Sequence, residues 1–219
     1  MFIGHFGLGL AAKPVARKVS LGTLLLASQF IDLLWPTLLL LGLETVRIVP
    51  GATELTPLEF VNYPISHSLL AVAGWSIFFG AAYFAIRREA WYAFICASLV
   101  ASHWLLDLLT HRPDLALIPG GSIRVGLGLW NSPVCAISIE MLLFVGGLFL
   151  YLKTTIPSDK VGSFGLGALV LFLTVIHIGN IVGPPPPSVR AIAWVGQAQW
   201  LLVAWGYWVD RHRELRAAT

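Results

Sequence analysis

Three ionisable side chains follow one another at four-residue intervals in the segment SHWLLDLLTHRPD: His103, Asp107 and His111. Residues four apart share one face of an α-helix, so a helix here would place all three on one stripe. His103 and His111 would then lie about 12 Å apart along the axis, at 1.5 Å per residue. The ligands of one zinc ion all lie about 2 Å from the metal, so one ion cannot bind both histidines. We predict that His103 and Asp107 bind a metal and that His111 lies at the rim, as a ligand of a second metal, a substrate contact or a residue without a catalytic role.

Other ionisable residues interrupt apolar stretches elsewhere in the chain. An ionisable side chain near the middle of a bilayer costs about 2.5–3.5 kcal/mol on insertion scales, so such residues are rare and mark functional sites. No basic residue lies within the apolar stretches to pair with these side chains, which favours a metal ion, a proton or a histidine as their partner. A lone histidine in a membrane helix also commonly serves as a hydrogen-bond partner between helices. The residues concerned are Asp32, His67, Glu140 and His177.

The composition indicates the kind of protein that contains these residues. The chain has 219 residues, of which 57% are hydrophobic and 11% charged, and its mean hydropathy is +0.80. Soluble domains carry roughly 25% charged residues, so the composition argues against a soluble globular protein. Continuously apolar runs of about 20 residues recur, long enough to cross a bilayer about 30 Å thick, whereas barrel strands would alternate. The basic residues are dispersed rather than clustered, which argues against nucleic-acid binding.

We therefore predict an all-α fold, a polytopic bundle of about six transmembrane helices that forms a single integral membrane domain over residues 1–219. The first segment, MFIGHFGLGLAAK, is too short to span, because about 12 helical residues rise only about 18 Å. It could lie flat at the membrane surface, or enter as a short N-terminal half-helix and carry His5 towards the midplane. The predicted spans are 21–43, 68–86, 91–110, 133–152, 164–182 and 191–209.

The distribution of Lys and Arg predicts the orientation of the bundle. With six spans, ten of the fourteen basic residues fall on the side of the two termini and four on the opposite side. Cytoplasmic loops carry the excess of Lys and Arg, so both termini are expected in the cytoplasm. The first span then runs outward and the next inward, and Asp32 lies near the midplane. The polar residues that fall together in the outer half of the membrane are His67, His103, Asp107, Glu140 and His177.

The Ser-His-Ser sequence that opens the second span supports a metal site. Ser66 is a candidate N-cap, which would place His67 at the amino end of a helix. The positive end of the helix dipole disfavours the imidazolium form of His67. A neutral imidazole is the form that binds a metal.

The order of these motifs resembles that of a known family. GHFGLGLAAK, FIDLLWP, YPISHSLL and SHWLLDLLTH together resemble the bacterial inner-membrane family of membrane-bound metal-dependent hydrolases, over about residues 1–115. The resemblance implies a multi-pass protein of the bacterial inner (plasma) membrane and favours entry of the N-terminal half-helix. Family members often have Pro-Asp-x-Asp where this chain has Ile-Asp-Leu-Leu, which argues against a second metal there. The matching polar positions are His5, Asp32, His67, His103 and Asp107.

These residues favour a metal-dependent membrane hydrolase whose site opens outward. A divalent cation is expected as cofactor, with Zn²⁺ as the favoured ion. Three or four protein ligands leave a position for water, whose pKa falls towards 7 on the metal. Glu140 or His177 would be the catalytic general base or would orient another group. The metal ligands would be His5, Asp32, His67, His103 and Asp107.

Basic residues in the outer loops suggest the substrate. Arginine binds phosphate groups well, so the outer loops would contact an anionic head group, and a lipid-linked phosphoester is the expected substrate. The expected partners are thus the lipid bilayer and a lipid or lipid-linked molecule. The residues that would contact this substrate are His111, Arg112, Arg124 and Arg47.

Two other functions fit the same residues. Intramembrane aspartates and histidines also form relays in metal- or proton-coupled transporters, although the two halves of this chain show no evident inverted repeat. A non-catalytic membrane protein with a metal-stabilised core is the third hypothesis.

Overall fold

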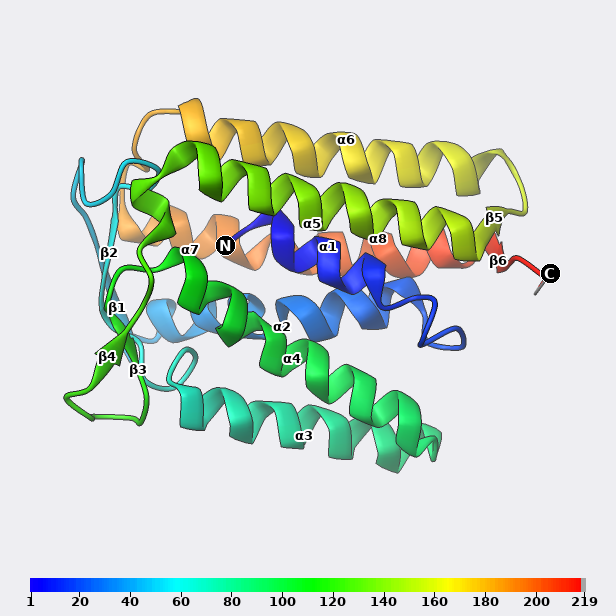
Figure 1. Ribbon diagram of the computed structural model, residues 1–219, viewed down its shortest axis with the longest axis horizontal. Helices are drawn as coiled ribbons and strands as arrows, with labels where there is room; N and C mark the ends of the chain where they lie inside the picture. The colour runs from blue at the N-terminus through cyan, green and yellow to red at the C-terminus, as the bar shows by residue number, and fades with distance from the viewer. Residues whose placement is uncertain (218–219) are drawn as a thin grey trace.

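The structure, a computed structural model, describes residues 1–217 and is mostly helical. Most of its helices run roughly along one long axis, and short strands lie at the two ends (Figure 1). The helices are α1 (Ile3–Ala11), α2 (Leu21–Leu40), α3 (Leu69–Arg87), α4 (Ala90–Thr110), the 3₁₀ turn η1 (Leu129–Asn131), α5 (Pro133–Thr154), α6 (Lys160–Val182), α7 (Val189–Gln197) and α8 (Gln199–Asp210). The strands are β1 (Thr45–Ile48), β2 (Leu58–Asn62), β3 (Leu115–Ala116), β4 (Arg124–Val125), β5 (Thr155–Pro157) and β6 (Arg213–Leu215).

Five of these helices, α2 to α6, are long and apolar enough to cross a membrane. They correspond to the first five predicted spans, and no boundary differs from its prediction by more than four residues. The predicted helical class and these five segments are therefore confirmed as helices of spanning length.

The sixth predicted span, 191–209, is wrong as a single helix. The chain forms α7 and then α8 there, and each is too short to span. The break lies beside the proline within α2, where a Cβ on Gly196 would overlap the ring of Pro36. One residue later, Gln197 Nε2 donates a hydrogen bond of 2.7 Å to Thr37 Oγ1. These two contacts hold the end of α7 against α2, and the helix is interrupted at Ala198 before α8 begins.

The amino end of α3 also differs from the prediction. Ser68, not Ser66, is the N-cap, since its backbone is extended and its Oγ accepts a hydrogen bond from the N–H of Ala71 at 3.3 Å. The Ser66 hydroxyl instead contacts Glu44 Oε2 and His67 Nδ1. His67 therefore precedes the helix and belongs to the connection between β2 and α3.

The half-helix α1 lies inside the bundle, between α5 and α2, as the second of the two predicted alternatives describes (Figure 1). Ile3 and Phe6 are fully buried. The closest approach is to α5, where a Cβ on Gly7 or on Gly147 would overlap the backbone of the other helix. Glycine at both positions lets the two backbones come this near. The contact holds His5, which is 1% exposed, in the interior.

Two antiparallel strand pairs, β1 with β2 and β3 with β4, lie at one end of the bundle (Figure 1). They occupy the connections between the first and second predicted spans and between the third and fourth. At the opposite end, β5 pairs with β6 and so joins the α5–α6 connection to the C-terminal segment (Figure 1). Each strand has two to five residues, too few for a period of two to be recognised in the sequence.

Large apolar side chains face outward on three of the long helices. Ile77 of α3 is 72% exposed, Leu142 of α5 is 74% exposed and Phe164 of α6 is 74% exposed. Soluble monomers rarely expose apolar surface over several helices, so these faces suit contact with lipid chains.

The packing of α1 on α5 can be tested at one position. Gly147→Ala should destabilise the protein by about 1–3 kcal/mol, because the new methyl group would overlap the backbone of α1. Gly146→Ala, on the neighbouring residue, is the matched control, since a Cβ there meets nothing within 4 Å. Thermal unfolding in detergent would compare the two variants. Equal stability of both would contradict the close approach of α1 to α5.

Candidate metal centre

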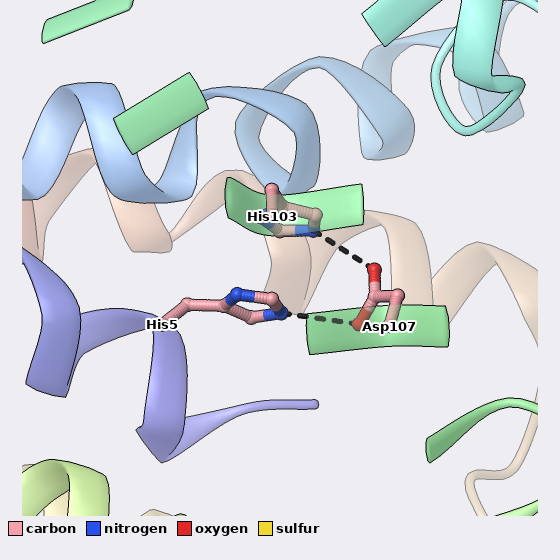
Figure 2. Close-up of side chains that lie close together, drawn as sticks. All are labelled: His5, His103 and Asp107. Atoms are coloured by element: carbon pink, nitrogen blue, oxygen red, sulfur yellow. Dashed lines mark hydrogen bonds and ion pairs between the residues drawn. The ribbon is translucent and has the colours of Figure 1, made fainter. Parts of the chain in front are cut away.

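Four segments bring five polar side chains together in the interior. α1 carries His5, α2 carries Asp32, the connection before α3 carries His67, and α4 carries both His103 and Asp107. The Asp32 side chain is 20% exposed and the other four are at most 3% exposed. Figure 2 shows His5 of α1 and His103 of α4 directed at Asp107. The structure thus brings together all five predicted metal-ligating residues, and their role as ligands stays a prediction.

The separations between these side chains suit a bound cation. Asp107 Oδ2 lies 3.2 Å from His103 Nε2 and 3.7 Å from His67 Nε2. Asp32 Oδ1 lies 3.5 Å from His103 Nε2 and 3.6 Å from His67 Nε2. Atoms that share one tetrahedral ion at about 2 Å lie about 3–4 Å from one another. Each of these four separations falls in that range.

A hydrogen bond on the far side of the ring fixes the tautomer of His103. Its Nδ1 lies 3.0 Å from the backbone carbonyl oxygen of Ser28. A carbonyl can only accept, so Nδ1 carries the proton and the neutral ring has its lone pair on Nε2. Nε2 is buried and makes no hydrogen bond within residues 1–217. On the neutral ring this lone pair faces the carboxylates of Asp32 and Asp107, an unfavourable arrangement that a bound cation or a second proton on the ring relieves.

The tautomer of His67 is fixed by a chain of two hydrogen bonds. Ser66 Oγ donates to Glu44 Oε2 at 2.6 Å and lies 2.7 Å from His67 Nδ1. A hydroxyl has one proton, and Ser66 gives it to Glu44, so His67 Nδ1 must be the donor. The lone pair of His67 is again on Nε2, on the side of the two aspartates. Glu44 and Ser66 thus orient His67, a predicted metal ligand, a role that the sequence did not reveal because they lie 22 residues apart.

The five residues form two overlapping groups that could hold a metal ion. One group is Asp32, His67 and His103, and the other is His5, His103 and Asp107. Both groups contain His103, and one imidazole nitrogen binds one ion, so two ions cannot share it. The set that best fits one ion is Asp32, His67 and His103, together with Oδ2 of Asp107.

His5 contacts the other oxygen of Asp107. His5 Nε2 lies 3.2 Å from Asp107 Oδ1, and the Met1 amino group lies 2.7 Å from the same oxygen. The His5 ring stacks on that of His103, with centroids 3.7 Å apart and planes 3° apart. This position lets His5 orient both Asp107 and His103, in addition to any role as a ligand.

Glu140 and His177, the predicted catalytic residues, lie at the amino end of α1. Glu140 Oε2 accepts hydrogen bonds from the N–H groups of Phe2 at 2.9 Å and Gly4 at 3.3 Å, so it caps this helix. The His177 ring stacks on Phe2 at 6.4 Å, and its Nε2 is buried without a partner within residues 1–217. Neither makes a hydrogen bond to the metal-centre residues in the described chain. Their catalytic roles stay predictions, and Glu140 has a structural role that the sequence did not reveal.

His111 lies at the end of α4, in an aromatic and acidic group. Its Nδ1 lies 2.9 Å from Asp114 Oδ1, and the Tyr63 hydroxyl donates to the same oxygen at 2.6 Å. The ring centroid is 4.7 Å from that of Phe60 and 4.3 Å from that of Trp130. Burial lowers the pKa of His111, and burial together with the Asp114 charge raises the pKa of Tyr63. His111 is thus outside both groups that could hold the ion.

The three predicted substrate-binding arginines lie in the segments of the strand pairs. Arg112 lies 3.2 Å from a Glu59 oxygen and 3.5 Å from an Asp114 oxygen. Arg47 lies 4.0 Å from Glu59, and Arg124 donates to the backbone carbonyl of Asp114 at 2.9 Å. An anionic ligand at Arg112 would therefore compete with two carboxylates.

Imidazole nitrogens and carboxylate oxygens together suit a divalent cation of intermediate softness, such as Zn²⁺.

No protein-family model matches the chain, and neither a curated protein nor a solved structure matches it.

Metal content provides a direct test of the site. We expect the purified protein to bind about one Zn²⁺ per chain, and His67→Ala and His103→Ala each to lower the affinity by more than about 100-fold. His212→Ala is the matched control, because His212 lies at the opposite end of the bundle, 2.7 Å from Asp159. Elemental analysis after dialysis would measure the bound metal. Unchanged metal in His103→Ala would refute the site.

The Glu44–Ser66–His67 chain should also affect metal affinity. Ser66→Ala removes the acceptor of the His67 Nδ1 proton and should weaken metal binding about 10–100-fold. Ser98→Ala, on the exposed part of α4, removes only a bond to the carbonyl of Phe94 and should have no effect. Competition with a chelating dye would measure both affinities. Equal affinities of the two variants would show that Ser66 does not support the site.

Proposed function

We propose that this chain is a polytopic membrane protein of the inner membrane and acts as a metal-dependent hydrolase, as the family that its motifs resemble would imply. The proposal depends chiefly on one observation: Nε2 of His67 and Nε2 of His103 both face the carboxylates of Asp32 and Asp107, while the contacts at Nδ1 leave Nε2 as the lone-pair atom of each neutral ring. Five apolar helices of spanning length support insertion into a membrane.

The residues of the centre have distinct proposed roles. Asp32, His67, His103 and Asp107 hold the cation, and His5 orients the last two from α1. A divalent cation supplies Lewis acidity, which polarises a scissile ester and acidifies water. Asp32 is the most exposed of the five, at 20%, so water and substrate would approach from its side.

A phosphoester carried by a lipid is the proposed substrate class. The centre lies among helices whose outward faces are apolar, so a bilayer-anchored substrate could approach it without leaving the membrane. Arg112 would bind the phosphate by exchanging its contact with Glu59 for a bidentate one. Arg47, Arg124 and His111 would complete this contact.

We infer that the C-terminal segment and the carboxyl end of α1, where Lys13 contacts Asp210, face the cytoplasm, whereas Met1 lies in the interior against Asp107. The C-terminal segment with β5 and β6 lies at the same end of the bundle as the connection between α3 and α4 (Figure 1). That connection contains Arg87 and Arg88, and the C-terminal segment contains Arg211, Arg213 and Arg216. Basic residues collect on the cytoplasmic side, so the end with β1 to β4 would face outward.

Hydrolysis can be measured on protein in lipid nanodiscs. Zinc-loaded protein should release phosphate or head group from lipid phosphoesters, and His67→Ala and His103→Ala should lower the rate by at least about 100-fold, as expected when a metal ligand is lost. His212→Ala should retain the full rate. A chelator should abolish the activity and added Zn²⁺ should restore it.

Two outcomes would overturn the hydrolase. Bound metal without turnover of any lipid phosphoester would indicate a structural metal. Metal or proton flux into liposomes, lost in His103→Ala, would indicate a transporter.

A further inference from the structure

Two adjoining cavities lie at the end of the molecule far from β1 to β4. Their volumes are about 320 Å³ and about 370 Å³, and both are lined by Leu152 near the end of α5. The larger one is also lined by Phe149, Lys153 and Arg216. The smaller one lies between α5 and α6, with Arg213 of β6 among its lining residues. Together they form a groove on the flank of the bundle, which we call the α5–α6 groove.

The polarity of the groove changes along its length. Val170 of α6 lines the part towards the middle of the helices, and Leu148 of α5 and Leu166 of α6, each six residues from the end of its helix, line the part between Val170 and that end. Arg213 lines the part at the end, where β5 and β6 pair. Leu148 and Leu152 are one turn apart, about 6 Å along α5. The groove is therefore apolar towards the middle of the bundle and basic at its end.

The basic side chains of the groove have neutral partners. Arg213 donates to the Thr155 hydroxyl and carbonyl at 3.1 and 3.2 Å and to the Gly162 carbonyl at 2.8 Å. Lys153 Nζ lies 4.6 Å from the centre of the Phe149 ring. Within residues 1–217 neither Arg213 nor Lys153 forms an ion pair with a carboxylate. Arg112, by contrast, has two carboxylate neighbours. Two positive charges without an ion-pair partner in the described residues thus lie beside an apolar groove.

The groove also has room for a chain-like ligand. A Cβ built on Gly167, which lines the groove, meets no atom within 4 Å. Phe149 beside the groove is 54% exposed and Phe164 near the start of α6 is 74% exposed, so the groove opens on the apolar flank. In a membrane that flank would meet lipid, and the basic end would lie at the level of the head groups.

We infer that the α5–α6 groove binds one anionic phospholipid of the leaflet at that end. Its acyl chain lies along Leu148, Leu166 and Val170, and its phosphate contacts Arg213 with Lys153 close by. The charge and the order of polarity match such a lipid, with the anion at the interface and the chain towards the midplane. The inference requires the proposed membrane insertion but neither the metal nor hydrolysis.

Lipid retention would test this site. Delipidated full-length protein in detergent is titrated with phosphatidylglycerol, phosphatidylcholine or inorganic phosphate, and bound lipid is counted by native mass spectrometry. We expect one phosphatidylglycerol to bind about tenfold more tightly than phosphatidylcholine, because two basic side chains favour its net negative charge over a head group that the choline ammonium makes neutral overall. Inorganic phosphate should not displace it, because phosphate lacks the chain.

Matched variants separate the groove from general lipid contact. Gly167→Leu should fill the groove and abolish the preference, whereas Gly179→Leu, at another open position of α6, should not. Lys153→Gln should weaken phosphatidylglycerol binding, whereas Lys160→Gln, on the same end but outside the groove lining, should not. Arg213 is left unchanged, because it also holds β5 to α6.

Three results would overturn the inference. Equal binding of both lipids, or binding unaffected by Gly167→Leu, would indicate surface lipid only. A dimer that Gly167→Leu dissociates would show that a second copy fills the groove. Metal content and hydrolysis are measured on the same groove variants. A failure of the lipid site can then be told apart from a failure of the metal centre.

Discussion

The hydrogen bond from His103 Nδ1 to the carbonyl oxygen of Ser28 fixes the orientation of the ring, so that Nε2 is the nitrogen that faces Asp32 and Asp107. A carbonyl cannot donate, so the proton stays on Nδ1 and the Nε2 lone pair is directed at Asp32 and Asp107. His67 reaches the same state through Ser66, whose single proton is given to Glu44. Two lone pairs and two carboxylates then surround one point in a region of low dielectric, where a charge without a partner is costly. A divalent cation at that point would be attracted to both lone pairs and both carboxylates and would so remove the repulsion between them.

Two other buried carboxylates nearby, Glu44 and Glu140, already accept hydrogen bonds from N–H or O–H groups. This distinguishes them from the carboxylates of Asp32 and Asp107 that face the two histidines. Glu44 accepts from the N–H groups of Ile65 and Ser66 and from the Ser66 hydroxyl. Glu140 accepts from two N–H groups at the amino end of α1. Asp107 is intermediate, since Oδ1 has donors and Oδ2 faces the two histidines. Asp32 faces only histidine Nε2 atoms among its ion-pair contacts in the described chain, so it has the greatest need of a cation.

The sequence predicts the parts of this arrangement that depend on local spacing or on polarity. The spacing of His103 and Asp107 places them on one helical face, and the scarcity of charge in the apolar segments singles out Asp32 and His67. The parts that depend on tertiary contacts could not be predicted. The division of 191–209 into α7 and α8 depends on Pro36 of a distant helix, and the tautomer of His67 depends on a glutamate 22 residues before Ser66. Local propensity carries no information about either contact.

The depth of the metal centre in the bundle follows from the length and anchoring of α1. At its carboxyl end, Lys13 Nζ donates to the Val19 carbonyl at 2.7 Å and lies 3.3 Å from Asp210 at the end of α8. The nine residues of α1 rise about 14 Å from there. The helix then ends in the interior, where the positive end of its dipole faces Glu140 and the Asp107 carboxylate. The same short helix thus places His5 against His103 and directs positive potential at the buried carboxylate of Asp107, which His5 also contacts.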